Sequence, residues 1–101
     1  MRYSGPMGHT TLYEVLNEAM DDGTPRAIRP GDWVFVEEGA ALEEGAVYVV
    51  EANGALLVRE ARREGGAWVF APWNPAHHTL PLERVRVVGR VVRTTAFRML
   101  R

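Results

Sequence analysis

The dipeptide Asn53-Gly54 is the feature that most constrains how this chain folds. It lies between "AVYVVEA" (46–52) and "ALLVREA" (55–61), two runs rich in β-branched and apolar residues. Asn-Gly between two such runs is the strongest short signal for a β-hairpin, because both residues tolerate the positive φ angles of a tight turn. Gly65-Gly66 comes directly before "AWVFAP" (67–72) and predicts a second hairpin.

Short apolar runs separated by turn residues extend this pattern over the rest of the sequence. "DWVFVE" (32–37) has apolar residues on both alternating faces, as in a strand that is covered on both sides. "VRVVGRVVRTT" (85–95) predicts a long last strand in which Gly89 marks a bulge or bend. "EEGAALEEG" (37–45) and "PWNPAHHTLPLE" (72–83) are predicted loops. The fold class expected is all-β: a meandering, partly closed β-sheet domain with β-hairpins.

Composition limits the class of protein. A chain of 101 residues forms one domain with a self-sufficient core. It has no cysteine, which excludes disulfides, thiolate metal sites and cysteine nucleophiles. No apolar stretch is long enough for a membrane span or a signal peptide, so a cytoplasmic location is expected, and no motif predicts a cofactor. The net charge of −1 provides no general attraction for nucleic acid.

Local sequence patterns allow either a helix or a strand for "TTLYEVLNEAM" (10–20). Thr11 and Glu14 have the spacing of a capping box, and five apolar residues fall at helical spacing: Leu12, Val15, Leu16, Ala19 and Met20. Read as a strand, the same segment separates apolar from polar residues less well. Periodicity alone therefore favours a helix.

Taken in order, five segments resemble the C-terminal domain of the LexA/UmuD/phage-repressor family, self-cleaving serine-lysine peptidases related to signal peptidases. They are "LYEVLNEAM" (12–20), "IRPGDWVFVE" (28–37), "EGAVYVVEANGALLVREARREGGAWVF" (44–70), "PWNPAH" (72–77) and "VRVVGRVV" (85–92). The resemblance covers most of the chain. It implies the family's β fold and makes residues 11–18 the first strand, against the helix that periodicity favours.

The sequence departs from this family where its chemistry lies. Family members activate a serine hydroxyl with a neutral lysine. The resemblance places Ala19 at the serine position and Arg59 at the lysine position. Alanine provides no nucleophile, and arginine stays protonated and cannot accept the proton. The expected protein is therefore not an enzyme but a pseudo-peptidase, with Ala19 and Arg59 as degenerate catalytic positions.

The resemblance also has consequences for domain organisation. We expect a flexible N-terminal segment (1–10) followed by a single LexA C-terminal-like domain (11–101) without a DNA-binding domain. No Ala-Gly bond of the kind that the family cleaves occurs in the chain. The predicted role is dimerisation or the regulation of a partner in transcription, such as a LexA/CI-like repressor.

Two other classes of function remain open on the sequence, an active enzyme and a nucleic-acid-binding protein. The enzyme would be either a peptidase that uses another nucleophile (Thr10, Thr11 or Thr24) or a hydrolase around His77-His78. The three carboxylates Asp21, Asp22 and Asp32 are more simply explained as turn residues than as a hydrolytic or metal site. Adjacent histidines on an extended chain point in opposite directions, so a metal site is not favoured either.

The arginine-rich C-terminal segment is the most distinctive surface. A basic strand suits a small β-barrel that binds nucleic acid, but the acidic remainder of the chain and the lack of a row of stacking aromatics argue against direct binding. In the resembled family the C-terminal strand and tail form a homodimer. The predicted interface residues are Trp73, Arg90, Val91, Arg93, Phe97 and Leu100.

Overall fold

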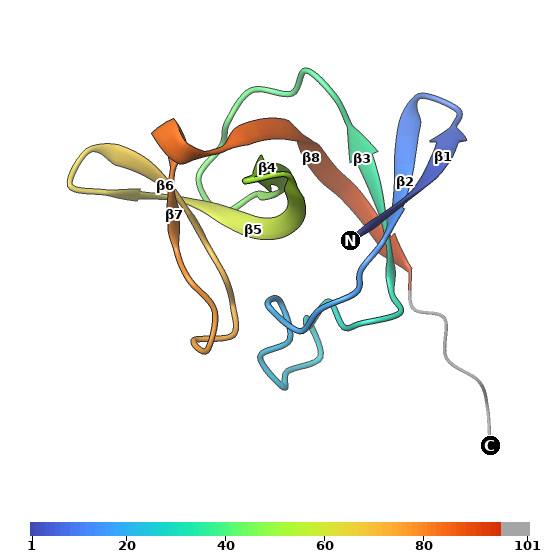
Figure 1. The fold of residues 1–101 in the computed structure, drawn as a ribbon, viewed down its shortest axis with the longest axis horizontal. Helices are drawn as coiled ribbons and strands as arrows, with labels where there is room; N and C mark the ends of the chain where they lie inside the picture. The colour runs from blue at the N-terminus through green and yellow to red at the C-terminus, as the bar shows by residue number, and fades with distance from the viewer. Residues whose placement is uncertain (96–101) are drawn as a thin grey trace.

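The computed structural model describes residues 1–95, which form one antiparallel sheet of eight strands (Figure 1). The strands run in the spatial order β1-β2-β3-β8-β4-β5-β6-β7. Their bounds are β1 Arg2–Met7, β2 Thr10–Glu14, β3 Trp33–Glu37, β4 Val47–Ala52, β5 Ala55–Glu64, β6 Ala67–Ala71, β7 Leu80–Pro81 and β8 Arg86–Thr95. The predicted all-β class is confirmed, and the sheet is open, with β1 and β7 at its two edges. No helix among residues 1–95 is long and apolar enough to cross a membrane.

Both predicted hairpins are present. Asn53 and Gly54 connect β4 to β5 with φ angles of 51° and 79°. Such angles suit the right-handed twist of the flanking strands. Gly65 and Gly66 connect β5 to β6 in the same way, with φ angles of 58° and 81°.

The N-terminal part of the chain forms strands. Residues 10–14 form β2, so the helix favoured by periodicity is wrong, and the strand implied by the family resemblance is confirmed for this stretch. Pairing with β3 explains the outcome, because Tyr13 opposite Val34 becomes part of the core. Residues 2–7, expected to be flexible, instead form β1, which pairs with β2 and packs Tyr3 edge-on against Tyr13.

β8 organises the centre of the sheet, because it pairs with both β3 and β4. The register shifts twice along it, once next to Gly89, as predicted, and once at Val92. A Cβ atom at Gly89 would lie 2.6 Å from the backbone oxygen of Glu37. Glycine at position 89 therefore allows β8 to lie this close to β3.

The core lies on both faces of the sheet. One cluster contains Tyr13, Val15, Met20, Ile28, Val34, Val36, Val49 and Val58, and the other contains Tyr48, Val50, Ala61 and Phe70. This arrangement explains why β4 is apolar at successive positions: its residues alternate between the two clusters.

Two irregular segments emerge from the same side of the sheet, at the bottom of Figure 1. The first, residues 15–32, connects β2 to β3, and the second, residues 72–79, connects β6 to β7. We call them the 15–32 loop and the 72–79 loop. The sequence predicted one long loop over 72–83, but Leu80–Pro81 pairs with β6 as β7 and Leu82–Arg84 forms a 3-10 turn.

Candidate functional site

Ala19 lies in the 15–32 loop with only 1% of its surface exposed. Its backbone N–H donates to Oδ1 of Asn17 at 3.0 Å, and its carbonyl oxygen accepts from the N–H of Asn74 at 2.9 Å. The next residue, Met20, is equally buried and belongs to the core. The position that the resemblance assigns to a nucleophile is thus held on both sides by hydrogen bonds and presents only a methyl group.

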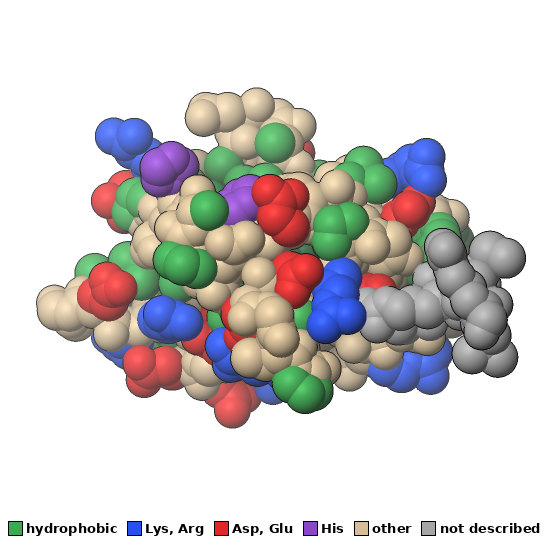
Figure 2. All heavy atoms as spheres, turned by 90° about the horizontal axis from the view of Figure 1, so that it is seen from below, with side chains coloured by type: hydrophobic (Ala, Val, Ile, Leu, Met, Phe, Trp, Pro, Cys, Tyr) green, Lys and Arg blue, Asp and Glu red, His purple; other side chains and the backbone are tan. Residues whose placement is uncertain are grey.

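The residue before Ala19 strengthens the contact between the two loops. The carbonyl oxygen of Glu18 accepts from Nδ2 of Asn74 at 3.1 Å, and its carboxylate Oε1 lies 3.2 Å from Nε2 of His77. A backbone hydrogen bond, followed by the hydrogen bond with His77, lowers the pKa of the Glu18 carboxyl. Figure 2 shows histidine next to acidic side chains on this face of the molecule. His77 therefore joins two loops, and Asn74 is a residue whose role the sequence did not predict.

Arg59 is a buried cation on β5, opposite Tyr48 of β4, with 4% of its surface exposed. Its Nε donates to the carbonyl oxygen of His78 at 3.3 Å, and its Nη1 donates to the carbonyl oxygen of Val58 at 2.8 Å. Burial lowers the pKa of the guanidinium. Arginine nevertheless keeps its proton in proteins, so this group can donate hydrogen bonds but cannot act as a base.

The 72–79 loop connects the two predicted positions. Asn74 binds the backbone of Ala19, and four residues later His78 accepts from Arg59. The 72–79 loop therefore contacts both Ala19 and Arg59. Their assignment to the serine and lysine positions of the family stays a prediction.

Three of the predicted interface residues, Trp73, Val91 and Arg93, line one groove of about 330 Å³. The groove is completed by residues that the sequence did not single out, namely Arg26, Ile28, Val47, Val92 and Thr94. Arg90 instead pairs with Glu43 at 2.9 Å, and the predicted residues Phe97 and Leu100 lie outside the described residues. Nothing in the sequence around Arg26 indicated its place here, because the fold of the 15–32 loop determines it.

Trp73 is held in this groove by two contacts. Its indole Nε1 donates to Oε2 of Glu60 at 3.2 Å, and the guanidinium of Arg26 lies 4.0 Å from the ring centroid. Trp73 is half-buried, as Trp33 and Trp68 are.

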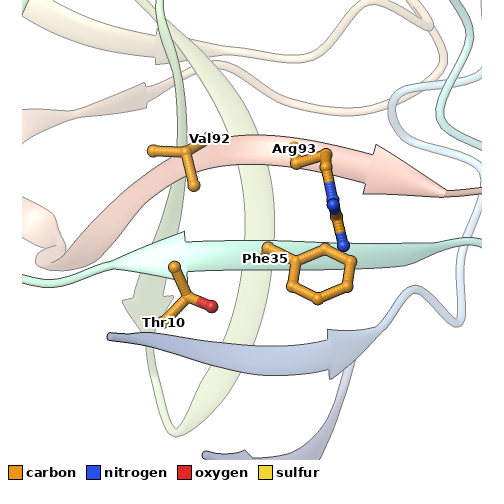
Figure 3. A pocket seen from close by; sticks show the side chains of 4 residues that line it. All are labelled: Thr10, Phe35, Val92 and Arg93. Atoms are coloured by element: carbon orange, nitrogen blue, oxygen red, sulfur yellow. The ribbon is translucent and has the colours of Figure 1, made fainter. Parts of the chain in front are cut away.

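A second hollow of about 370 Å³ lies across three adjacent strands (Figure 3). It is lined by Thr10 of β2, Phe35 of β3, and Val92 and Arg93 of β8. The Arg93 guanidinium lies 4.2 Å from the centroid of the Phe35 ring. Arg93 therefore borders both hollows.

The side chains named for an enzymatic alternative take part in local structure. Thr24 and Arg26 both donate to the carboxylate of Asp22, Asp21 lies near Arg29, and Asp32 accepts from the backbone N–H of Arg29. Thr10 and Thr11 lie in β2. Within residues 1–95, no three histidine, aspartate or glutamate side chains gather as metal ligands would. The carboxylates thus organise the 15–32 loop, as expected of turn residues.

Comparison with known proteins defines the family of this chain. It belongs to the Peptidase S24-like family, whose sequence model matches residues 4–92. It is 32% identical over 85 residues to the LexA repressor of Mycobacterium sp. (strain KMS), and the aligned region covers 84% of this chain and 36% of that repressor. It is 31% identical over 88 residues to the LexA repressor of Acidothermus cellulolyticus, and the aligned region covers 85% of this chain and 31% of that repressor. The predicted family is confirmed, and the chain spans about a third of the length of these relatives.

Proposed function

We propose that this chain is a non-catalytic LexA-like domain that acts by binding: it dimerises, and it regulates a LexA/CI-like repressor. The observation that carries the proposal is the pair of residues at the predicted catalytic positions. Ala19 presents a buried methyl group, and Arg59 presents a guanidinium bound to backbone carbonyls. Peptide hydrolysis by a serine-lysine pair needs a hydroxyl and a group that accepts its proton, and neither residue supplies one.

The framework around these positions supports a binding role. The 15–32 and 72–79 loops are joined by hydrogen bonds at Ala19, Glu18 and Asn74. A surface held in this way loses little conformational entropy when a partner binds. Three of the predicted interface residues already lie together along one groove.

Sedimentation velocity of the pure chain, alone and mixed with a LexA-type repressor from the same genome, tests the proposal. The proposal predicts a homodimer, a complex with the repressor, or both. A strict monomer that does not bind the repressor would contradict the proposed function. Charge reversal at Arg93 is expected to weaken association, whereas the same change at Arg63, an exposed arginine on the β5–β6 hairpin, is a matched control.

A further inference from the structure

Arg59 carries a buried charge that no carboxylate of residues 1–95 neutralises. None of the ion pairs in this range includes it. Glu60, the next residue on β5, directs its carboxylate to Arg62 and to the indole N–H of Trp73 instead. Burial lowers the pKa of Arg59, and no neighbouring carboxylate offsets that shift. Buried charges are normally paired, so Arg59 is an exception within this fold.

The guanidinium of Arg59 has N–H groups that make no hydrogen bond within the described residues. Its Nε–H donates to the carbonyl oxygen of His78, and one N–H of Nη1 donates to that of Val58. The remaining N–H groups, on Nη1 and Nη2, donate to no atom of residues 1–95. Every fully buried polar side-chain atom in that range has a hydrogen-bond partner, so Nη2 must contact solvent. The guanidinium therefore lies just below the surface, with one of its nitrogens accessible.

The fold holds this guanidinium in place from two sides. Arg59 lies within β5, which pairs with β4 at this position. On the other side, the 72–79 loop supplies the carbonyl oxygen of His78. This loop is itself joined to the 15–32 loop by hydrogen bonds of Asn74. A donor positioned in this way loses little conformational entropy when it binds a ligand.

We propose that Arg59 binds a carboxylate ligand at a site between β5 and the 72–79 loop. The two oxygens of a carboxylate accept side by side from neighbouring N–H groups of a guanidinium, and Nη1 and Nη2 of Arg59 offer such a pair. The ligand also supplies the negative charge that residues 1–95 do not place beside Arg59. Two sources present a carboxylate on a narrow end: a small monocarboxylic acid and the C-terminus of a peptide. The inference goes beyond the proposed function, because this site needs neither a dimer nor a repressor.

Phosphate is a less suitable ligand for this site. The partners of the Arg59 guanidinium are carbonyl oxygens, of His78 and Val58, which repel further oxygens of a bulky anion. A doubly charged phosphate also loses more hydration on burial than a singly charged carboxylate does. A carboxylate is planar and carries one charge, so it matches the single cation at this position.

NMR of the arginine Nε–H signals, recorded on the full chain, tests this inference. Sodium acetate replaces sodium chloride at constant ionic strength, and acetamide serves as a neutral ligand of nearly the same shape. We expect the Arg59 signal to shift saturably with acetate but not with acetamide. Arg63 is the matched control, because it also lies on β5 and donates to a backbone carbonyl but is exposed, and its signal should not saturate. Triglycine and triglycine amide repeat the comparison for a peptide C-terminus.

A pair of variants adds a second measurement. Acetate should raise the urea midpoint of the native chain, since a ligand that binds only the folded state stabilises it. Arg59→Gln removes the charge but keeps a side-chain donor, and it should weaken acetate binding about tenfold or more. Arg63→Gln should bind acetate as the native chain does. Circular dichroism verifies that each variant is folded.

The outcomes separate the two sources of the carboxylate and also expose a wrong inference. Tighter binding of triglycine than of acetate assigns the site to a peptide C-terminus, and equal or weaker binding assigns it to a small acid. The inference is overturned if neither ligand shifts the Arg59 signal, or if acetamide and triglycine amide shift it as strongly. It is also overturned if the Arg63 signal saturates over the same concentrations, or if folded Arg59→Gln binds acetate as well as the native chain. Should Arg59→Gln not fold, the titration of the native chain decides by itself.

Discussion

Replacing Arg59 by lysine tests the view that this position now holds a structural cation rather than a base. Arg59 is almost fully buried and donates to the carbonyl oxygens of His78 and Val58. A lysine has one charged nitrogen, so it would lose part of this geometry, at a cost of about 1.5–3 kcal/mol for a hydrogen bond to a charged group. Burial, which lowers the pKa of Arg59, would also lower the pKa of a lysine there.

The direction of the pH dependence follows from this shift. The pKa of lysine in the unfolded chain is about 10.4, and each unit by which folding lowers it costs about 1.4 kcal/mol while both states are charged. As pH rises through the lowered pKa, the folded state loses its proton first, and the penalty decreases until it disappears above about pH 10.4. The Arg59→Lys variant should therefore be about 3 kcal/mol less stable than the native chain near pH 7 and recover part of that loss by about pH 10.

Urea denaturation of the variant and the native chain, at several pH values between about 7 and 10, measures the difference in their free energies of unfolding. Subtracting the native curve removes titrations common to both proteins, such as that of Tyr13, whose pKa burial raises. The exposed Arg63 provides the control, because lysine at that position should show no such recovery. A stability difference that is constant or grows between about pH 7 and pH 10 would refute the reasoning.

Three further predictions concern the framework. Gly89→Ala should destabilise the fold by about 1–3 kcal/mol in urea denaturation, because the new methyl group would lie 2.6 Å from the Glu37 oxygen; an unchanged midpoint would contradict this. Tyr48→Phe should cost about 1–3 kcal/mol, since the fully buried hydroxyl accepts from one backbone N–H and donates to one carbonyl of the preceding loop; calorimetry showing no change would argue against it. The pKa of the Asp22 carboxyl is lowered to about 2, and the hydrogen bond from the Thr24 side chain is the largest cause. In Thr24→Val this pKa, measured by NMR, should rise towards 3.8, and a pKa that stays near 2 would exclude Thr24 as the cause.

The sequence was most informative where turn chemistry and apolar runs coincide. Asn53-Gly54 and Gly65-Gly66 predicted two hairpins, because their backbone angles follow from the residues themselves. Residues 10–14 were ambiguous for the opposite reason, since a five-residue strand is stabilised mainly by its neighbours β1 and β3. Local periodicity does not report such pairing.

The candidate site could be predicted only in part. The positions Ala19 and Arg59 came from the family resemblance, but their connection through Asn74 and His78 depends on how the 72–79 loop folds. The place of Arg26 in the groove that Trp73 and Val91 line likewise depends on tertiary structure, because Arg26 and Val91 are 65 positions apart in the sequence. Side chains brought together by irregular loops leave no periodic signal in a sequence.

Intact-mass spectrometry after incubation with peptides and with a LexA-type repressor tests the central claim most directly. The native chain and the double variant Ala19→Ser/Arg59→Lys are compared at raised pH, where a buried lysine is neutral. The variant carries a serine and a lysine at the two predicted catalytic positions, whereas the native chain carries alanine and arginine there. We predict that the native chain leaves every substrate and itself uncleaved. Cleavage products formed by the native chain would contradict the proposal that this domain acts by binding alone.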